Sequence, residues 1–382
     1  MKFGGELPEL FDLAGKQYPV KSGPDGWTEF RLTPAPLFLR SRNPERLVSA
    51  LKEAEVLGAG ASVQVSFKPD LSGKISAAVT NLTGRTQSGR LFLGSVAHPF
   101  RVDGNRVQMI SLSSSVQPRF GEMFRKAFSY RLVQDGAAET AGEWNMDYFY
   151  VPKVEGAPDW TKIPGIRMTN LYRPEINLKR TPGGHPGDLS ALFKAAWDKE
   201  NFYLRVEAED DIFRVDDPGF WSSEEAKSRH LYRLDGCLEV YFDCGANGRL
   251  RKGGFDLDDY RYDFCAGNRE GKSGSGLVCR FREVFQEYAG GPNMPSRKEA
   301  AEKIRCDFQR VSKTKYIYTI TFPQRYLEPM RLQKGTVAGF GLYLHDRMDD
   351  GTMGNKGMSL ATAPGAHCDA SPHLWPLMIL TE

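Results

Sequence analysis

Acidic side chains gather at several points of this sequence and offer its clearest potential chemistry. The main groups are Asp210-Asp211, Asp216-Asp217, Asp256-Leu-Asp258-Asp259 and Asp346-x-x-Asp349-Asp350. Carboxylate oxygens are the hard ligands that calcium requires. None of these groups has the spacing of the twelve-residue EF-hand loop, and solvated turns are their default explanation.

Two catalytic hypotheses use the same kinds of residue. A pair of carboxylates across a cleft would supply the acid and base of a glycosidase, but nothing in the sequence fixes their separation. His345 and His367-Cys368-Asp369 suggest a cysteine nucleophile. Loop histidines without a placed partner are more often structural, so we expect no enzyme activity from this chain.

The overall composition excludes several classes of protein. The 382 residues carry 51 Lys and Arg against 48 Asp and Glu, a net charge of +3. Nucleic-acid binding requires a concentrated basic surface, which this balance does not provide. The mean hydropathy is −0.46 and no apolar run has the length needed to span a bilayer. We therefore expect neither a nucleic-acid nor a membrane partner.

Short alternating runs separated by Gly, Pro and Asn turns predict an all-β fold of two sandwich domains. Hydrophobic residues alternate with polar ones in segments 63–67, 202–208, 238–242, 260–264 and 316–322. Asn43-Pro44 predicts the start of one helix, and capping boxes at Ser222 and Ser296 predict two short helices among long loops. The C-terminal sandwich is the larger of the two.

The cysteines and the first residues bear on the cellular compartment. All six cysteines lie between Cys237 and Cys368, and no pair has the Cys-x-x-Cys spacing of a zinc or redox site. Both disulfides and buried free thiols remain open. Lys2 is followed by Phe-Gly-Gly-Glu and not by the apolar core that a signal peptide would have, so we expect no signal peptide in these residues. We expect either a cytoplasmic protein or part of a longer chain.

Several blocks in the second half resemble carbohydrate-binding module family 9. They begin with Asp159-Trp160 and continue in the family's order, covering about residues 155–382: Ala196-Trp197-Asp198, Glu207-Ala-Glu-Asp210-Asp211, Asp235-Gly-Cys-Leu-Glu239-Val-Tyr-Phe-Asp243, Asp259-Tyr-Arg261-Tyr, Tyr318-Thr-Ile-Thr-Phe-Pro323 and Gly339-Phe-Gly-Leu-Tyr-Leu-His-Asp346. The resemblance implies a non-catalytic β-sandwich that binds poly- or oligosaccharide, with structural calcium and no organic cofactor.

Family 9 modules hold a sugar between two tryptophans, beside arginine, glutamate and amide side chains. Glu239 and Arg261 stand in the matching blocks, and Trp375 lies near the family's C-terminal aromatic residue. The second tryptophan is missing from its usual place before Glu239, where Trp221 or Tyr232 could substitute. The resemblance also points to Asp210 and Asp211 as calcium ligands.

Each of these residues also has a structural explanation. Trp375, between Leu374 and Pro376, is as consistent with a core position as with a binding surface. Arg261 alternates with Tyr260 and Tyr262, so it points away from the face that they fill. An ion pair with Asp263 or Glu239 would then account for it. Haem-binding relatives of this sandwich ligate iron through Met, and Met348, Met353 and Met358 lie near His345; their loop, rich in Gly and Asp, is a poor haem pocket.

The first residues resemble another type of domain. Leu10-Phe-Asp12-Leu-Ala-Gly15 and Phe30-Arg-Leu-Thr-Pro-Ala-Pro36 look like the closing strands of a sandwich that accompanies many glycoside hydrolases. We expect residues 1–41 to be those terminal strands, 42–154 an immunoglobulin-like sandwich, and 155–382 the family 9-like sandwich. The chain would be an accessory region of a larger, exported (extracellular or periplasmic) carbohydrate-active enzyme. The alternative is a scaffold sandwich that packs against a catalytic domain and has no ligand of its own.

Overall fold

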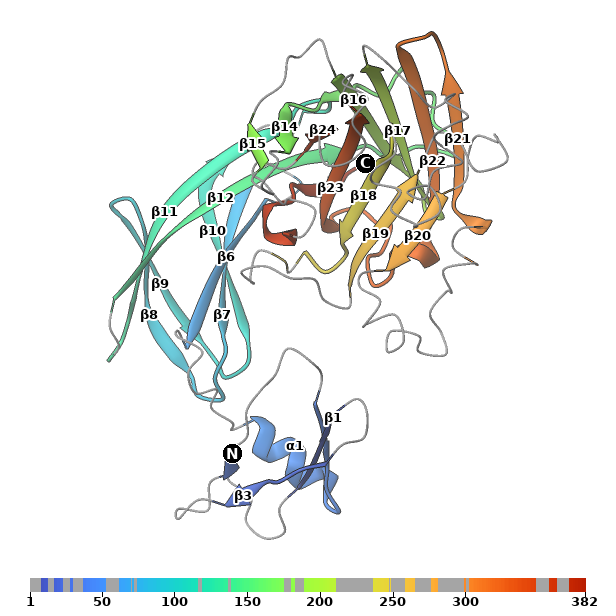
Figure 1. The fold of residues 1–382 in the computed structure, drawn as a ribbon. Coiled ribbons are helices and arrows are strands. Elements are labelled where there is room, and N and C mark those ends of the chain that lie inside the picture. Colours follow the sequence, from blue (N-terminus) through green and yellow to red (C-terminus); the bar gives the residue numbers. More distant parts are fainter. Residues whose placement is uncertain are drawn as a thin grey trace. The chain divides into compact units, whose positions relative to one another are not determined.

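The described residues of the computed structural model lie mostly in β-strands, with one α-helix, which confirms the predicted all-β fold (Figure 1). It divides into two compact units, one formed by Met1–Lys68, Lys74–Ser114 and Ala127–Asn145, the other by the rest of the chain. The described residues are 8–12, 17–22, 28–29, 37–52, 62–69, 71, 74–115, 119–136, 139–174, 180–182, 189–210, 236–246, 248, 258–264, 276–280, 299, 302–347, 357–362 and 371–382. The capping boxes at Ser222 and Ser296 lie outside them.

The N-terminal segment of the first unit contains the predicted helix. Asn43 Oδ1 accepts a hydrogen bond from the main-chain N–H of Arg46 at 3.0 Å, which caps the helix as expected. Leu47 and Ala50 are buried against Leu39. The elements are β1 (Glu9–Asp12), β2 (Gln17–Tyr18), β3 (Lys21–Ser22), β4 (Thr28–Glu29), β5 (Leu37–Arg40) and α1 (Pro44–Lys52), with β2-β1-β5 in one sheet and β3-β4 in another.

The rest of the first unit is built of longer strands in two sheets. One sheet has the order β10-β7-β6, and β11 pairs with β8 and β8 with β9 in the other. The rings of Phe67 and Phe128 stack at 5.0 Å between the sheets. The strands are β6 (Val63–Pro69), β7 (Lys74–Asn81), β8 (Gln87–Leu93), β9 (Val96–Val102), β10 (Val107–Ser115), β11 (Phe124–Gln134) and β12 (Thr140–Val151). An immunoglobulin-like classification of this part stays a prediction.

The second unit holds the largest core. Its five-stranded sheet has the order β13-β16-β17-β22-β21, and a second sheet places β23 between β24 and β25, with β18 pairing both β23 and β19. The strands are β13 (Ile166–Arg167), β14 (Asn170–Pro174), β15 (Arg180–Pro182), β16 (Leu189–Trp197), β17 (Asn201–Asp210), β18 (Leu238–Asp243), β19 (Asp259–Phe264), β20 (Gly276–Arg280), β21 (Arg305–Arg310), β22 (Lys315–Pro323), β23 (Val337–Arg347), β24 (Gly357–Ala361) and β25 (Leu377–Leu380).

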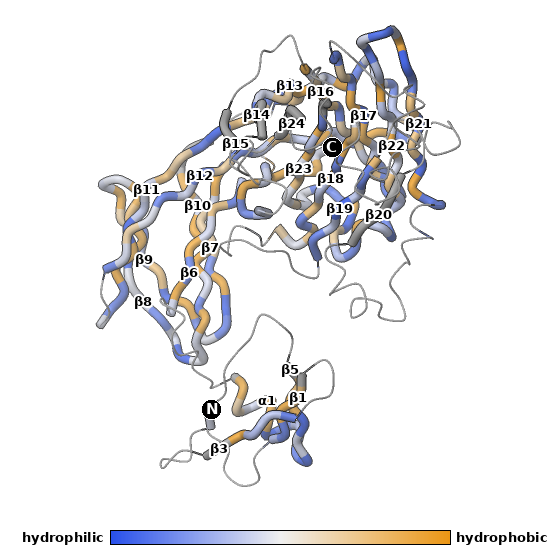
Figure 2. Tube along the Cα trace, in the orientation of Figure 1, coloured by the Kyte–Doolittle hydropathy of each residue, from blue (hydrophilic) through white to orange (hydrophobic). Residues whose placement is uncertain are grey.

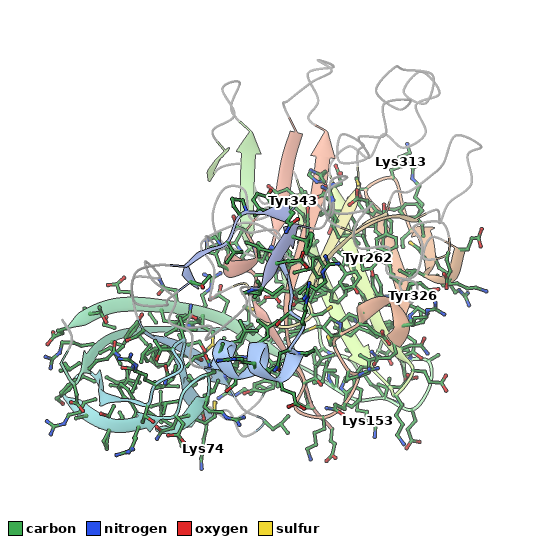
Figure 3. The ribbon with its side chains drawn as sticks, turned by 90° about the horizontal axis from the view of Figure 1, so that it is seen from below. Lys74, Lys153, Tyr262, Lys313, Tyr326 and Tyr343 are labelled. Atoms are coloured by element: carbon green, nitrogen blue, oxygen red, sulfur yellow. The ribbon has the colours of Figure 1, made fainter. Side chains whose placement is uncertain are left out.

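Alternation along the strands decides which side chains enter that core (Figure 2). One face of β18, β19 and β23 packs into it and includes Val240, Phe242, Tyr262, Phe340 and Leu342. The hydroxyl of Tyr262, labelled in Figure 3, donates to the main-chain carbonyl of Tyr326. The intervening residues of the same three strands therefore lie on the opposite face.

One strand belongs to both units. Residues Thr140–Asn145 of β12 lie in the first unit, and the strand ends at Val151 in the second. Its last four residues pair in parallel with β25, and Phe149 and Val151 are part of the large core. The five-stranded sheet also binds this strand, since Trp197 Nε1 donates to the carbonyls of Val151 and Thr381. No helix among the described residues is long and apolar enough to span a membrane.

Candidate functional site

Polar side chains collect on the face of β18, β19 and β23 that is turned away from the large core. The register puts Glu239 opposite Asp263 on one side and opposite Tyr343 on the other. In the next row Tyr241 lies opposite Arg261 and Gly341. His345 follows Tyr343 on the same face of β23, and Tyr343 is labelled in Figure 3. We call these six side chains the polar cluster: Glu239, Tyr241, Arg261, Asp263, Tyr343 and His345.

Glu239 is the centre of the polar cluster. Its carboxylate accepts hydrogen bonds from Arg261 Nη2 and from the Tyr241 hydroxyl. Nε2 of His345 lies 3.4 Å from Glu239 Oε1. Only 2% of Glu239 is exposed, so these neighbours replace the water that an ionised carboxylate otherwise requires.

Arg261 is fixed by carboxylates on two sides. Its Nε donates to Asp263 Oδ1 at 2.6 Å, and its Nη2 donates to Glu239. The ring centroid of Tyr241 lies 5.8 Å from the guanidinium carbon. Within the described residues, neither Arg261 Nη1 nor Asp263 Oδ2 makes a hydrogen bond. The Arg261 side chain is 18% exposed, so a ligand would meet an oriented donor and acceptor pair.

The surroundings of Glu239 and Asp263 shift the pKa values of their carboxyl groups in opposite directions. Burial alone would raise the pKa of Glu239, but the positive charge of Arg261 and the nearby His345 lower it. Burial and the charge of Glu239 raise the pKa of Asp263 to about 6, against the opposing effect of Arg261. Burial by itself would lower the pKa of Arg261. The negative charge of Glu239 has the opposite effect, and the pKa of Arg261 lies above its ordinary value. At neutral pH the carboxylates of Glu239 and Asp263 outnumber the single guanidinium of Arg261.

Trp375 lies beside the polar cluster and is only 1% exposed. Its ring centroid is 5.1 Å from that of Tyr241. It follows the short 3₁₀ helix η5 (Pro372–Leu374) and precedes β25, the neighbour of β23. In this arrangement the indole supports the cluster and does not offer an open face to a sugar.

Three of the five predicted sugar-binding residues therefore lie together. Glu239 and Arg261 are in direct contact, and Trp375 reaches them through Tyr241. Trp221 and Tyr232 lie outside the described residues. Arg261 points away from the face of Tyr260 and Tyr262 as expected, and it forms both ion pairs considered for it.

Sequence reasoning did not select Tyr241, Tyr343 or His345 as ligand-binding residues and considered Asp263 only as an ion-pair partner. Tyr241 and Asp263 each lie two residues from a selected residue on the same strand. The period of a β-strand places such neighbours on one face, and this signal would have found both.

The predicted calcium site involves residues at the end of β17. Asp210 is fully buried, and Asp211 lies outside the described residues. The described part of the chain contains no group of three or more His, Cys, Asp or Glu side chains that could hold a metal ion. The described residues supply the buried carboxylate of Asp210 from the predicted pair Asp210 and Asp211. The calcium site stays a prediction.

The residues behind the other hypotheses are described only in part. Cys368, Met348 and Met353 lie outside the described residues, whereas His345 belongs to the polar cluster. Among the cysteines, the structure describes buried free thiols at Cys237, Cys244 and Cys306.

Three similar solved structures are two of a carbohydrate binding module family 9 from Caldicellulosiruptor kristjanssonii, in complex with cellotriose and with glucose, and a putative carbohydrate-binding protein from Bacteroides uniformis ATCC 8492. Each is 12% identical and covers 61% of this chain, with 92%, 95% and 98% of the other chain covered and TM-scores of 0.41, 0.41 and 0.35. Curated protein sequences give no significant match.

The family assignment rests on a sequence profile. The profile of the family described as "Carbohydrate family 9 binding domain-like" matches residues 173–381, more than half of the chain. The match includes β16 to β25, and with them every residue of the polar cluster. The resemblance seen in the sequence is confirmed: the chain belongs to the carbohydrate family 9 binding domain-like family.

Proposed function

We propose that this chain binds a poly- or oligosaccharide, without catalysis, at the polar cluster. The observation that carries the proposal is Arg261, held between Glu239 and Asp263 with Nη1 free of hydrogen bonds to the described residues. Membership of a family of carbohydrate-binding domains supports it.

The chemistry of the cluster suits sugar hydroxyls. A hydroxyl both donates and accepts a hydrogen bond, so adjacent hydroxyls can donate to Asp263 Oδ2 and accept from Arg261 Nη1. The two ion pairs hold the guanidinium in place before a ligand arrives, which reduces the entropy lost on binding. A stacking ring would complete the site, and Trp221 and Tyr232 remain the predicted candidates.

The test is binding to a broad polysaccharide panel by affinity gel electrophoresis. Arg261→Met removes the oriented donor and should abolish binding. Arg205→Met is the matched control: Arg205 also donates through Nε to a carboxylate two residues along its strand, Glu207, at 2.7 Å, and its side chain is 22% exposed. This variant should bind like the parent chain. Equal binding by both variants would place the sugar elsewhere.

A second candidate function is a scaffold sandwich without a ligand. It is favoured by the burial of Trp375 and Glu239, which are 1% and 2% exposed. Failure to bind any member of the panel would support the scaffold and end the carbohydrate proposal.

The setting of the module is also part of the proposal. We infer that it acts outside the cell or in the periplasm, attached to a glycoside hydrolase, on the basis of the resemblance of residues 10–36 to hydrolase-associated strands. A single module would bind weakly, and its benefit to the enzyme would come from raising the effective concentration near polysaccharide. Calcium bound near Asp210 and Asp211 would have a structural role. Secretion of the full-length gene product with hydrolase activity is the observation to seek.

A further inference from the structure

Two carboxylates and one guanidinium lie together in the buried part of the polar cluster. Glu239 and Asp263 are 2% and 4% exposed, and among the residues that the structure describes Arg261 alone forms ion pairs with both of them. Charges that have lost most of their water interact strongly with any charge brought close to them. We therefore expect the affinity of this site for a sugar to depend on the charge of the sugar.

We infer that Asp263 makes the site select against acidic sugars, such as uronates, in favour of neutral ones. The inference rests on the proposed function, because it assigns a substrate class to the same site. Asp263 is the specificity-determining residue, since its Oδ2 is the carboxylate oxygen of the cluster that makes no hydrogen bond to the described residues.

The argument compares what each sugar would bring to Arg261. A neutral hydroxyl can accept from Nη1 while its neighbour donates to Asp263 Oδ2, so both groups are satisfied. A uronate carboxylate can accept from Nη1 but cannot donate to Oδ2. Three negative charges, those of the uronate, Glu239 and Asp263, then share the one guanidinium of Arg261, and their repulsion discriminates between ligands.

Acidification should weaken this selection. The pKa of Asp263 is raised to about 6, first by burial and then by the charge of Glu239. Below that pH the carboxyl becomes neutral and can donate a hydrogen bond, while a uronate keeps its charge. The other titratable or charged groups of the cluster are Glu239 and Tyr241 on β18, Arg261 on β19, and Tyr343 and His345 on β23.

His345 would also favour an anion if it gained a proton, so the pH profile needs a variant that separates the two groups. Asp263→Asn keeps the size of the side chain and removes its charge, while His345 is unchanged. Glu207→Gln is the matched control, because Glu207 pairs with an arginine two residues away on β17, outside the polar cluster.

The experiment measures affinity for two pairs of probes by isothermal titration, in which the members share their linkage and differ at C6: cellohexaose and its C6-oxidised form, and mannan and polymannuronate. At pH 7.5 the parent chain and Glu207→Gln should bind the neutral member of a recognised pair at least about tenfold more tightly. In Asp263→Asn the ratio should fall below about threefold. Thermal unfolding of each variant confirms that it is folded.

The same titrations at pH 5 provide a readout that a purely structural role would not change. The parent chain should gain affinity for the acidic member relative to the neutral one, and Asp263→Asn, which keeps His345, should show a clearly smaller gain. Equal binding of neutral and acidic probes by the parent chain at pH 7.5 would overturn this inference alone. Binding of no probe would overturn the proposed function and this inference with it.

Discussion

The indole of Trp375 fills the space that a side chain at Gly341 would need. A Cβ atom at position 341 would lie 3.2 Å from Trp375 Cδ1 and 3.3 Å from Cγ. Gly341 is opposite Tyr241 in the sheet, and Tyr241 contacts both Trp375 and Glu239. The glycine therefore decides whether the ring can lie against the polar cluster.

Gly341→Ala should displace Trp375 and destabilise the second unit by about 1–2 kcal/mol, since overpacking exceeds the gain in strand propensity. The measurement is urea unfolding followed by tryptophan fluorescence. In a Trp375→Ala background the same change should cost nothing, because the obstructing ring is gone. Additive effects of the two substitutions would contradict this account.

Trp375→Ala by itself should lower the free energy of unfolding by about 3–5 kcal/mol, as expected for removal of a fully buried ring. Trp160→Ala is the comparison, because Trp160 packs at the edge of a small cluster and is partly exposed. Its loss should cost clearly less. If Trp375→Ala unfolds normally but loses sugar binding, Trp375 is a binding surface and not a core residue.

Glu239→Gln should destabilise the protein by about 3–4 kcal/mol at pH 7, because it leaves a buried guanidinium with one partner. The pKa of Glu239 is lowered from its ordinary value of 4.5 to about 2. The ionised carboxylate therefore stabilises the fold fully at pH values above 4.5. This stabilisation is lost as the pH falls from there toward 2, and the variant should lack that loss. Glu207→Gln, with a side chain that is 32% exposed, should cost less than about 1 kcal/mol.

Asp263→Asn should have the opposite pH dependence. Because the pKa of Asp263 is raised to about 6, the folded state holds a proton between the ordinary value of 3.8 and pH 6 that the unfolded state has released. The stability of the parent chain then falls as pH rises through this window. The variant should gain about 1–3 kcal/mol relative to the parent chain from pH 4 to pH 7. A constant difference across chemical unfolding curves at several pH values would refute the raised pKa.

If calcium binds near Asp210, EDTA should lower the melting temperature, because metal loss is coupled to unfolding. Calcium added in excess should restore it. Asp210→Asn should melt at a lower temperature than the parent chain and no longer respond to EDTA. An unchanged melting curve with EDTA would count against the calcium prediction.

The spacing of hydrophobic residues along the sequence predicts much of the fold. Alternation in 238–242 and 260–264 predicts both strands and the direction of Arg261, and the structure has them as β18 and β19. The cap at Asn43 predicts the helix start for the same local reason. Each of these features depends on neighbours within a few residues.

The relationships within the site depend on residues far apart in the chain. Glu239 meets Asp263 and Tyr343 only because of the register of three strands, and a shift of one residue would reverse every face. The contact of Trp375 with Gly341 also requires β25 to lie next to β23. Such pairings follow from tertiary packing, which period and composition do not encode.

Strand β12 sets a limit on how the chain can be divided. A fragment beginning at residue 155 would lack Phe149 and Val151, two members of the large core, and would leave one edge of β25 without its parallel neighbour. The main-chain N–H of Thr381 would also lose the carbonyl of Val151, which it meets at 2.9 Å. A truncated second unit has to start before Met146 if it is to keep these core residues and the parallel neighbour of β25.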